Sequence, residues 1–308
     1  MPRPHVEFLH AQQLPWGPAP FPGDGWAGIE AKILSRDPGN GACSALLRLP
    51  AGLERGAHAL SAAQEWLVLD GALRRGATGY GLDDYAWLPP AHPAERLSSE
   101  RGAVLLAFFD REPGWLEATG GDAAAPDAAA APGATPIERL ATHDMPWTSH
   151  DIDPSVQFLV LSHKILRHVP ATGEKTILLS TGAQTHPRDW REARLAHDCV
   201  EEMYLLGGDI IGERGTMYEG AYFWRPAGQW HGPFGSRRGS LSLIRFVDGH
   251  HHNRWSEDVR PFVLEPAHAP ELPPELRAAA GFGVDAAGFG AGVSRTSPAP
   301  MPGRGGCS

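Results

Sequence analysis

The stretch "KILRHVPATGEKTILL" (residues 164–179) repeats the pattern of "KILSRDPGNGACSALL" (residues 32–47) at a constant offset of 132 residues. Further along the chain the offset becomes 137 residues, which places Glu65 on Glu202. Several matches at a constant offset indicate an internal duplication, and a repeat of this size corresponds to a whole domain. The sequence therefore predicts two copies of one domain.

Each copy consists of short apolar runs separated by turn residues. Examples are "EWLVLDG" (65–71), "AVLLAFF" (103–109), "TILLST" (176–181) and "LSLIRFV" (241–247). The chain contains 37 glycines and 29 prolines, and long helical periodicity is scarce. Many short strands broken by glycine and proline are typical of β-sandwiches and β-barrels, so we expect an all-β fold.

Two shifts in composition divide the chain. Residues 117–136 are largely alanine, glycine and proline with almost no core-forming side chain. We therefore expect a flexible linker there, between a first domain at residues 1–116 and a second domain at residues 137–265. Residues 266–308 end in a similarly glycine-, proline- and alanine-rich stretch, which predicts a mostly disordered tail.

The composition argues against several classes of protein. The chain has 36 acidic and 27 basic side chains, a net charge of -9 and no basic cluster, which argues against a nucleic-acid partner. No apolar stretch approaches the roughly 20 residues of a membrane span, and the N-terminus lacks the apolar core of a signal peptide. The cysteines Cys43, Cys199 and Cys307 form neither a disulfide framework nor a CxxC metal motif. We expect a reduced, cytoplasmic protein that acts on a small molecule.

The stretch "LAHDCVEEMYLLGGD" (residues 195–209) combines polar side chains with an apolar run. Side chains of a strand alternate between its two faces. His197 and Glu201 then share a face with apolar side chains, which identifies that face as the interior of a barrel. Glu202 points the other way, where it forms a surface ion pair or supports the site from outside, and it is also kept as an alternative ligand.

These residues belong to two spaced motifs. The pattern "H-x3-E-x6-G" covers His197, Glu201 and Gly208, and "P-x-G-x2-H" begins at Pro226 and ends at His231. Both resemble the signature motifs of the cupin superfamily. The surrounding sequence is similar to the cupin domain of the ChrR anti-sigma factor and to a group of uncharacterised bicupins, with a more distant similarity to acetylacetone dioxygenase. The resemblance implies two tandem jelly-roll β-barrels, which is a bicupin.

In the cupin pattern, His231 completes a metal site with His197 and Glu201. Two imidazoles and one carboxylate suit Fe(II), Mn(II), Zn(II) or Ni(II). The usual pattern has a further histidine where this chain has Leu195. The resemblance thus implies one divalent metal ion per chain, Fe(II) being the preferred assignment, with three protein ligands and open positions. The alternative is a set of buried structural residues, but an unpaired buried carboxylate would be costly.

The first copy lacks these ligands. Applying the offset of 137 residues backwards maps His197, Glu201 and His231 onto Leu60, Gln64 and Ala94. A degenerate site made of His58, Gln64 and His92 remains as an option, although amides are poor ligands for these metals. We expect no tightly bound metal in the first copy.

Other residues are candidates for a substrate pocket. One strand parity places the rings of Tyr222 and Trp224 beside the metal, where they would line a pocket for an apolar or aromatic substrate, and ordinary core packing is the alternative. Arg225 or Arg245, if inward-facing, would bind a substrate carboxylate. The tract "GHHHNRW" (residues 249–255) follows the last strand and predicts a polar loop rather than a site.

These features and the resemblance favour a metal-dependent bicupin enzyme. The leading hypothesis, which rests on fold analogy and a three-ligand site, is a mononuclear non-haem iron dioxygenase acting on a small dicarbonyl or phenolic substrate. One alternative is a sensor module that binds a ligand or metal without catalysis. Another is a zinc- or manganese-dependent hydrolase or isomerase. Because exposed edge strands need covering, we also expect a homodimer.

Overall fold

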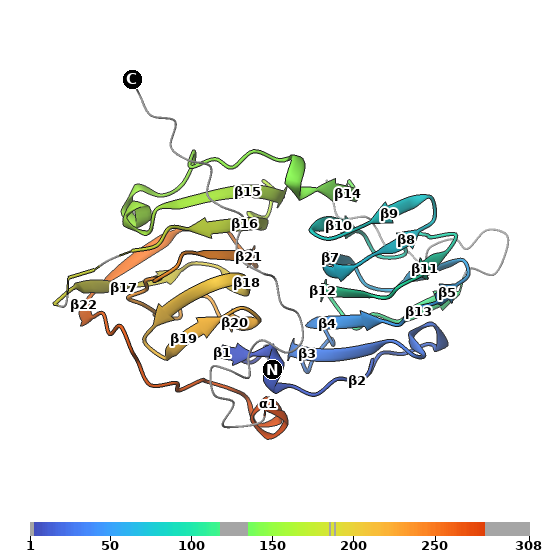
Figure 1. The fold of residues 1–308 in the computed structure, drawn as a ribbon, viewed down its shortest axis with the longest axis horizontal. Coiled ribbons are helices and arrows are strands. Elements are labelled where there is room, and N and C mark those ends of the chain that lie inside the picture. The colour runs from blue at the N-terminus through green and yellow to red at the C-terminus, as the bar shows by residue number, and fades with distance from the viewer. Residues whose placement is uncertain (1–2, 118–134, 185, 188, 281–308) are drawn as a thin grey trace.

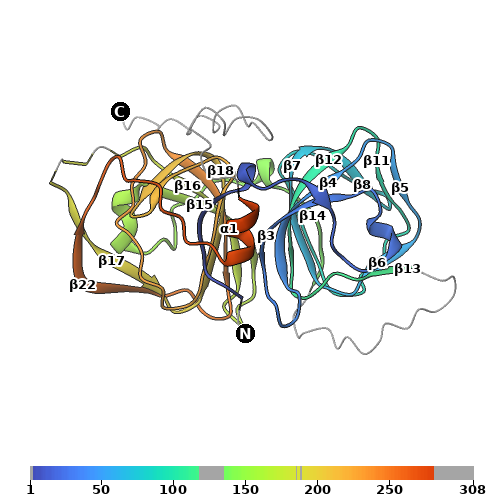
Figure 2. The ribbon, with the colours of Figure 1, turned by 90° about the horizontal axis from the view of Figure 1, so that it is seen from below.

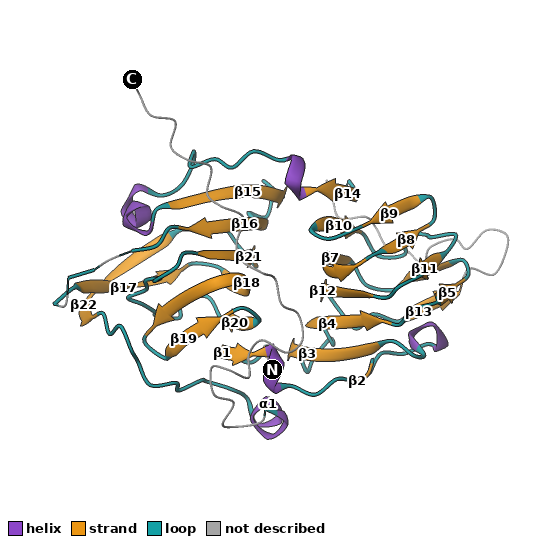
Figure 3. Cartoon of the chain, viewed as in Figure 1, coloured by secondary structure: helices purple, strands orange, loops and turns teal. Residues whose placement is uncertain are grey.

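The structure, a computed structural model, describes residues 3–117, 135–184, 186–187 and 189–280. The chain forms two β-barrels that lie side by side (Figure 1), and strands dominate both (Figure 3). The predicted all-β fold with two tandem jelly-roll domains is confirmed. The helices are short: η1 (Ala11–Gln13), η2 (Asp24–Trp26), η3 (Thr142–Asp144), η4 (Pro154–Leu159) and α1 (Pro274–Ala279).

The first barrel is built on one large antiparallel sheet. Its strands, in spatial order, are β14 (Ile137–Ala141), β10 (Asp84–Leu88), β7 (Gln64–Gly71), β12 (Ala103–Phe109), β4 (Cys43–Leu49), β3 (Glu30–Arg36) and β2 (Gly17–Pro18). A smaller sheet contains β5 (Leu53–Arg55), β11 (Leu97–Ser99), β8 (Leu73–Arg75) and β9 (Thr78–Tyr80), and a separate pair joins β13 (Trp115–Glu117) to β6 (His58–Leu60).

The second barrel repeats this plan. Its large sheet has the order β1 (Val6–His10), β20 (Ala221–Arg225), β18 (Val200–Gly212), β21 (Ser240–Val247), β16 (Lys175–Thr181) and β15 (Leu161–His168), and β19 (Gly215–Tyr218) pairs with β18. A separate two-stranded sheet joins β17 (Arg191–His197) to β22 (Asn253–Pro261). The order of the six strands matches β14 to β3 of the first barrel, so the duplication found in the sequence is present in the fold.

The first strand of each sheet comes from the other half of the chain. β1 pairs with β20, with Val6 opposite Trp224, and β14 pairs with β10, with Ile137 opposite Trp87. The sequence boundaries assign β1 to the domain at residues 1–116 and β14 to the domain at residues 137–265, but each strand completes the sheet of the opposite barrel. Composition shows where linkers lie but not which strands pair. The strand exchange could therefore not be predicted from composition.

The duplicated glycines have a steric reason. Gly71 in β7 and Gly208 in β18 have φ angles of +69° and +81°, in the region that favours glycine. A Cβ atom at Gly208 would lie 2.0 Å from the carbonyl oxygen of Gly239, and one at Gly71 would lie 2.2 Å from that of Gly102. Both barrels therefore bring two strands together in the same way at this point.

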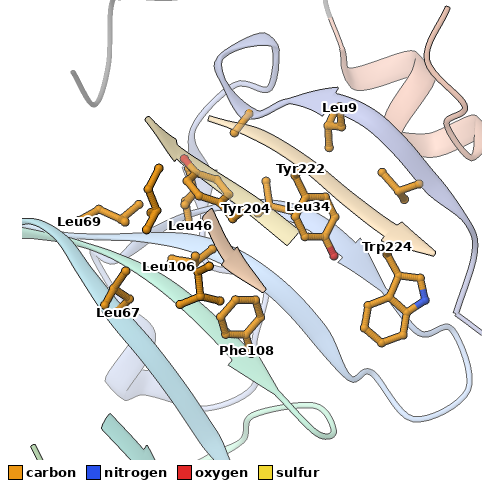
Figure 4. Close-up of a cluster of buried hydrophobic side chains, with 14 of the residues drawn as sticks. Leu9, Leu34, Leu46, Leu67, Leu69, Leu106, Phe108, Tyr204, Tyr222 and Trp224 are labelled. Carbon is orange, nitrogen blue, oxygen red and sulfur yellow. The ribbon is translucent and has the colours of Figure 1, made fainter. Parts of the chain in front are cut away.

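The central strands have two buried faces. In β7, Trp66 and Val68 face the interior of the first barrel, whereas Leu67 and Leu69 face the second barrel. Side chains from both large sheets meet in one inter-barrel cluster (Figure 4), which includes Leu34, Leu46, Leu67, Leu69, Leu106, Phe108, Tyr204, Tyr222 and Trp224. Burial on both faces explains why the strand sequences are nearly continuous apolar runs.

The segment after the second barrel packs against this cluster. Glu271 forms a β-bridge with Glu7, and Leu272, Leu276 and Ala280 are buried in the inter-barrel cluster. Figure 2 shows α1 between the two barrels. We expected a mostly disordered tail from residue 266. Up to Ala280 the structure differs from this expectation, because the apolar side chains of the segment pack against the inter-barrel cluster. The rest of that tail, and the expected linker from residue 118 to residue 134, lie outside the described residues.

A groove of about 460 Å³ lies beside α1, with walls that include Trp16, Ile33 and Leu276. None of the candidate site residues lines this groove, so the groove is not the candidate site. Among the described residues, no helix has the length and apolarity needed to cross a membrane.

Candidate metal centre

The predicted ligands His197, Glu201 and His231 lie together in the second barrel. One possible ligand atom from each lies within 4.8 Å of the other two, and all three residues are buried. Nε2 of His197 and Nε2 of His231 lie 3.5 Å and 3.9 Å from Oε2 of Glu201. His197 ends β17, Glu201 lies in β18, and His231 lies before β21, where its backbone pairs with Leu195. Three separate segments thus converge on one point.

The alternation of β18 places Glu201 inside the barrel. Cys199, Met203 and Leu205, which have the same parity, belong to the interior core of the second barrel. Tyr204 has the opposite parity and lies in the inter-barrel cluster. Glu201 therefore points into the interior of the second barrel. Burial raises the pKa of the Cys199 thiol to about 12, so this cysteine is a core residue rather than a nucleophile.

The second ring nitrogen of each histidine has a partner. Nδ1 of His231 lies 3.0 Å from the carbonyl oxygen of Gln229, which only accepts, so Nδ1 carries the hydrogen and Nε2 keeps a free lone pair. Nδ1 of His197 lies 3.1 Å from Nε2 of His251. Histidines that bind metals commonly donate their other N–H in this way. With Nδ1 of His197 as the donor, both rings present a free Nε2 toward Glu201.

The charge state of the cluster suits a divalent cation. Burial acts to raise the pKa of Glu201, but the charges of His197 and Arg225 outweigh it and hold that pKa well below its ordinary value. Burial, and then the charge of Arg225, lower the pKa of His231 to about 3. At neutral pH the cluster offers a carboxylate and a neutral imidazole of His231, which are forms that bind metal. The residues present therefore fit the divalent metal that the cupin resemblance implies.

A buried arginine connects Glu201 to the exchanged strand. Arg225, in β20, donates from Nη1 to Oε2 of Glu201 at 2.8 Å. Its Nε lies 2.9 Å and 3.0 Å from the two carboxylate oxygens of Glu7, in β1, and its Nη2 also donates to Glu7. Every nitrogen of the guanidinium group is in use. Arg225 faces inward, as considered from the sequence, but it is already paired and does not await a substrate carboxylate.

Phenylalanine rings surround the cluster. The ring of Phe246 lies 5.9 Å from that of His197, and the ring of Phe234 lies 5.6 Å from that of His231, measured between centroids. Phe223 lies under the guanidinium group of Arg225, with 3.5 Å between its centroid and the central carbon. The ligands therefore sit in largely apolar surroundings.

The other residues proposed near the site lie on the opposite face of the sheet. Tyr222 and Trp224 belong to the inter-barrel cluster, so the aromatic residue that faces the site is Phe223, between them. Glu202 is 1% exposed, accepts a hydrogen bond of 2.6 Å from the hydroxyl of Tyr222, and pairs with Arg245. Tyr222, Trp224 and Arg245 therefore do not line the site, and the alternative of core packing describes the two aromatic residues. Glu202 lies neither at the surface nor beside the ligands, which corrects its expected roles as a surface ion pair, a supporting residue or an alternative ligand. The outer face of this sheet is covered by the first barrel, which the parity argument could not reveal.

The residues of the proposed degenerate site have other partners. Within the described part of the first barrel, no group of three His, Cys, Asp or Glu side chains comes together as in the second. His58 stacks on Trp115 with 4.2 Å between centroids, and His92 pairs with Glu138 of the exchanged β14. Gln64 is buried at the start of β7.

The sequence reasoning missed two neighbours of the ligands. His251 lies in the histidine tract that we expected to be a polar loop, yet it contacts His197, because β17 pairs with β22 and places His197 opposite Asn253. The tract itself was the available signal. Glu7 has no local signal, since it reaches Arg225 only through strand exchange.

Comparisons with known proteins support this fold. The sequence profile of a family described as a domain of unknown function (DUF4437) matches residues 7–254. A crystal structure described as "a putative dioxygenase" from Nostoc punctiforme is 18% identical, with a TM-score of 0.68, and the match covers 84% of this chain and 87% of that chain. The oxalate decarboxylase formate complex from Lactobacillus farciminis is 10% identical, with a TM-score of 0.51, covering 81% and 88%. These identities establish the fold and not the reaction. A search of curated proteins gives no match.

Proposed function

The chain belongs to the DUF4437 family, and we propose that it is a metal-dependent bicupin enzyme with one divalent metal ion held by His197, Glu201 and His231. The proposal rests on the convergence of two imidazole Nε2 atoms and one carboxylate oxygen in a buried site. When bound, the metal would supply Lewis-acid or redox chemistry at positions that the protein leaves open. The donor set suits Fe(II) best in our proposal, with zinc, manganese and nickel as the alternatives.

The reaction we propose is oxygenation of a small dicarbonyl or phenolic substrate. Two histidines and one carboxylate form the ligand set of many non-haem iron oxygenases. The phenylalanines Phe223, Phe234 and Phe246 limit the access of water and favour an apolar or aromatic substrate. The Nostoc protein with the same fold, described as "a putative dioxygenase", points in the same direction. Since each nitrogen of Arg225 already donates to Glu7 or Glu201, we do not assign this arginine to a substrate carboxylate.

Two other functions use the same residues. A zinc- or manganese-dependent hydrolase or isomerase would need the same three ligands and differ in metal and in oxygen dependence. A sensor module would bind a metal or ligand without turnover. Metal identity and oxygen consumption separate these possibilities.

The first test is elemental analysis of protein purified without oxygen. We expect about one iron per chain in the parent, by the stoichiometry of a three-ligand site. His197→Ala and His231→Ala should lose the metal. His252→Ala, an exposed histidine of the neighbouring tract, is the matched control and should keep it. Zinc or manganese in the parent would favour hydrolysis or isomerisation, and no metal after reconstitution would overturn the proposal.

The second test is oxygen uptake by the iron-loaded protein with a panel of dicarbonyls and phenols. Uptake that depends on His231 would support an oxygenase. An iron-loaded protein that consumes no oxygen with any member of the panel would contradict the oxygenase proposal and favour the sensor module.

A further inference from the structure

The metal centre proposed above includes a charged residue from the opposite end of the chain. Glu7 lies on β1, which crosses from the first half of the chain into the sheet of the second barrel. Glu7 and Arg225 are 4% and 2% exposed, so water screens neither charge. A carboxylate and a guanidinium group buried together interact strongly, and each is costly to leave without the other.

The geometry divides the guanidinium group between two carboxylates. Glu7 accepts from Nε and Nη2 of Arg225, which leaves Nη1 for Glu201. Nη1 contacts the same oxygen of Glu201 that faces the two histidine ligands. The position of Arg225 therefore sets where that oxygen lies, and Glu7 holds Arg225 by two of its three nitrogens.

Glu7 is itself held in place. Oε2 of Glu7 lies 2.8 Å from Nε2 of His5, and Nδ1 of His5 lies 3.1 Å from Oε1 of Glu271. The backbone of Glu7 also forms a β-bridge with Glu271. These contacts hold the carboxylate of Glu7 beside Arg225.

The balance of charge shows what Glu7 contributes to the site. Apart from the histidines, the charges of Glu201, Arg225 and Glu7 sum to one net negative charge. Without the carboxylate of Glu7, Arg225 neutralises Glu201 and the group has no net charge to attract a divalent cation. Nearby fixed charges act strongly in such a buried site.

We propose that Glu7 supports the metal centre through its charge: it neutralises Arg225, so that the carboxylate of Glu201 keeps the site negative enough to take a divalent cation. The inference rests on the proposed metal binding by His197, Glu201 and His231. It means that the exchanged strand strengthens metal binding by the second barrel. Residues that contact metal ligands from outside commonly change metal affinity 10- to 100-fold when they are replaced, which sets the size of the expected effect.

The test is a titration with Co(II) at low ionic strength, followed by the visible absorption of the bound ion, on the full chain. Glu7→Gln should bind Co(II) at least about tenfold more weakly than the parent. The double variant Glu7→Gln with Arg225→Gln restores the single net negative charge and should return to within about threefold of the parent. Glu138→Gln is the matched control, because Glu138 lies on the exchanged strand of the other barrel, where the position equivalent to Arg225 is Leu88.

The outcomes separate the inference from the proposed function. A parent that binds no Co(II) would overturn the metal centre and the inference together. A parent that binds, with Glu7→Gln equally tight or the double variant as weak as Glu7→Gln, would overturn the inference alone. Should Glu7→Gln fail to fold, Arg225→Gln decides: it leaves two carboxylates at the site and should bind Co(II) more tightly, and weaker binding would overturn the inference.

Discussion

The buried ion pair of Glu7 with Arg225 predicts how the free energy of unfolding depends on pH. Burial acts to raise the pKa of Glu7, but the charge of Arg225 and the hydrogen bonds from His5 and Arg225 lower it to about 2, against an ordinary value of 4.5. At about 1.4 kcal/mol per pKa unit, the ionised carboxylate contributes about 3 kcal/mol to the free energy of unfolding at neutral pH. Because the folded pKa is depressed, this contribution is present above pH 4.5 and is lost as the pH falls toward 2.

The assay is urea unfolding of the parent and of Glu7→Gln between pH 7 and pH 3. We expect the variant to be less stable by about 3 kcal/mol at pH 7, with the difference constant to about pH 5 and shrinking below that. Glu138→Gln serves as control, since the side chain of Glu138 is 50% exposed and its removal should cost less than about 1 kcal/mol. A difference below about 1 kcal/mol at pH 7, or one that persists undiminished at pH 3, would refute the reasoning.

The remaining predictions concern the barrels, the ligands and assembly. Leu106→Ala opens a cavity in the inter-barrel cluster and should cost about 2–5 kcal/mol, with one unfolding transition seen by both far- and near-ultraviolet circular dichroism; two separate transitions would contradict a shared core. Arg245→Met leaves the buried Glu65 without its ion pair and Glu202 with Arg3 alone, and should cost about 3–5 kcal/mol in urea unfolding, while Co(II) affinity stays within about twofold; a large loss of affinity would return Arg245 to the site. His251→Phe removes the partner of His197 and should weaken Co(II) binding by about 10- to 100-fold, so parent-like binding would rule out an orienting role. Light scattering should give a homodimer of the 33.1 kDa chain, and a monomer would rule it out.

The ligand cluster could be predicted because its signal is local. Glu201 lies in a strand whose interior parity is marked by apolar residues, and the cupin motifs supply His197 and His231. The same argument failed for Tyr222 and Trp224. In a strand that is buried on both faces, alternation separates the two sets of side chains but does not say which set faces the ligands.

Contacts between distant segments set the limit of the prediction. The exchange of β1 and β14, and the packing of Leu276 between the barrels, depend on surfaces that exist only after both sheets have formed. Glu7 is therefore invisible as a site residue in a sequence read segment by segment. His251 was within reach, because it lies two residues before the residue that pairs with His197.

The inter-barrel contact contains two equivalent polar networks. Glu65 accepts hydrogen bonds of 2.7 Å from the hydroxyl of Tyr85 and 2.5 Å from that of Thr176, and Glu202 accepts them from Tyr222 and Ser44. Each glutamate thus binds a tyrosine of its own barrel and a hydroxyl group of the other barrel. Arg245 pairs with both glutamates and joins the two networks.

These networks explain a feature of the sequence that the metal site cannot. The duplication retains Glu65 as the counterpart of Glu202, although the neighbouring ligand position has become Gln64. A glutamate on the outer face is needed in both copies, because each one accepts a hydrogen bond from the other barrel and a buried hydroxyl or charge left unpaired is costly. The ligand on the inner face serves only its own barrel, so it can be lost from one copy without exposing a charge in the other. The two neighbouring positions of the strand (64 and 65, or 201 and 202) can therefore differ independently, since alternate side chains face opposite sides of the sheet.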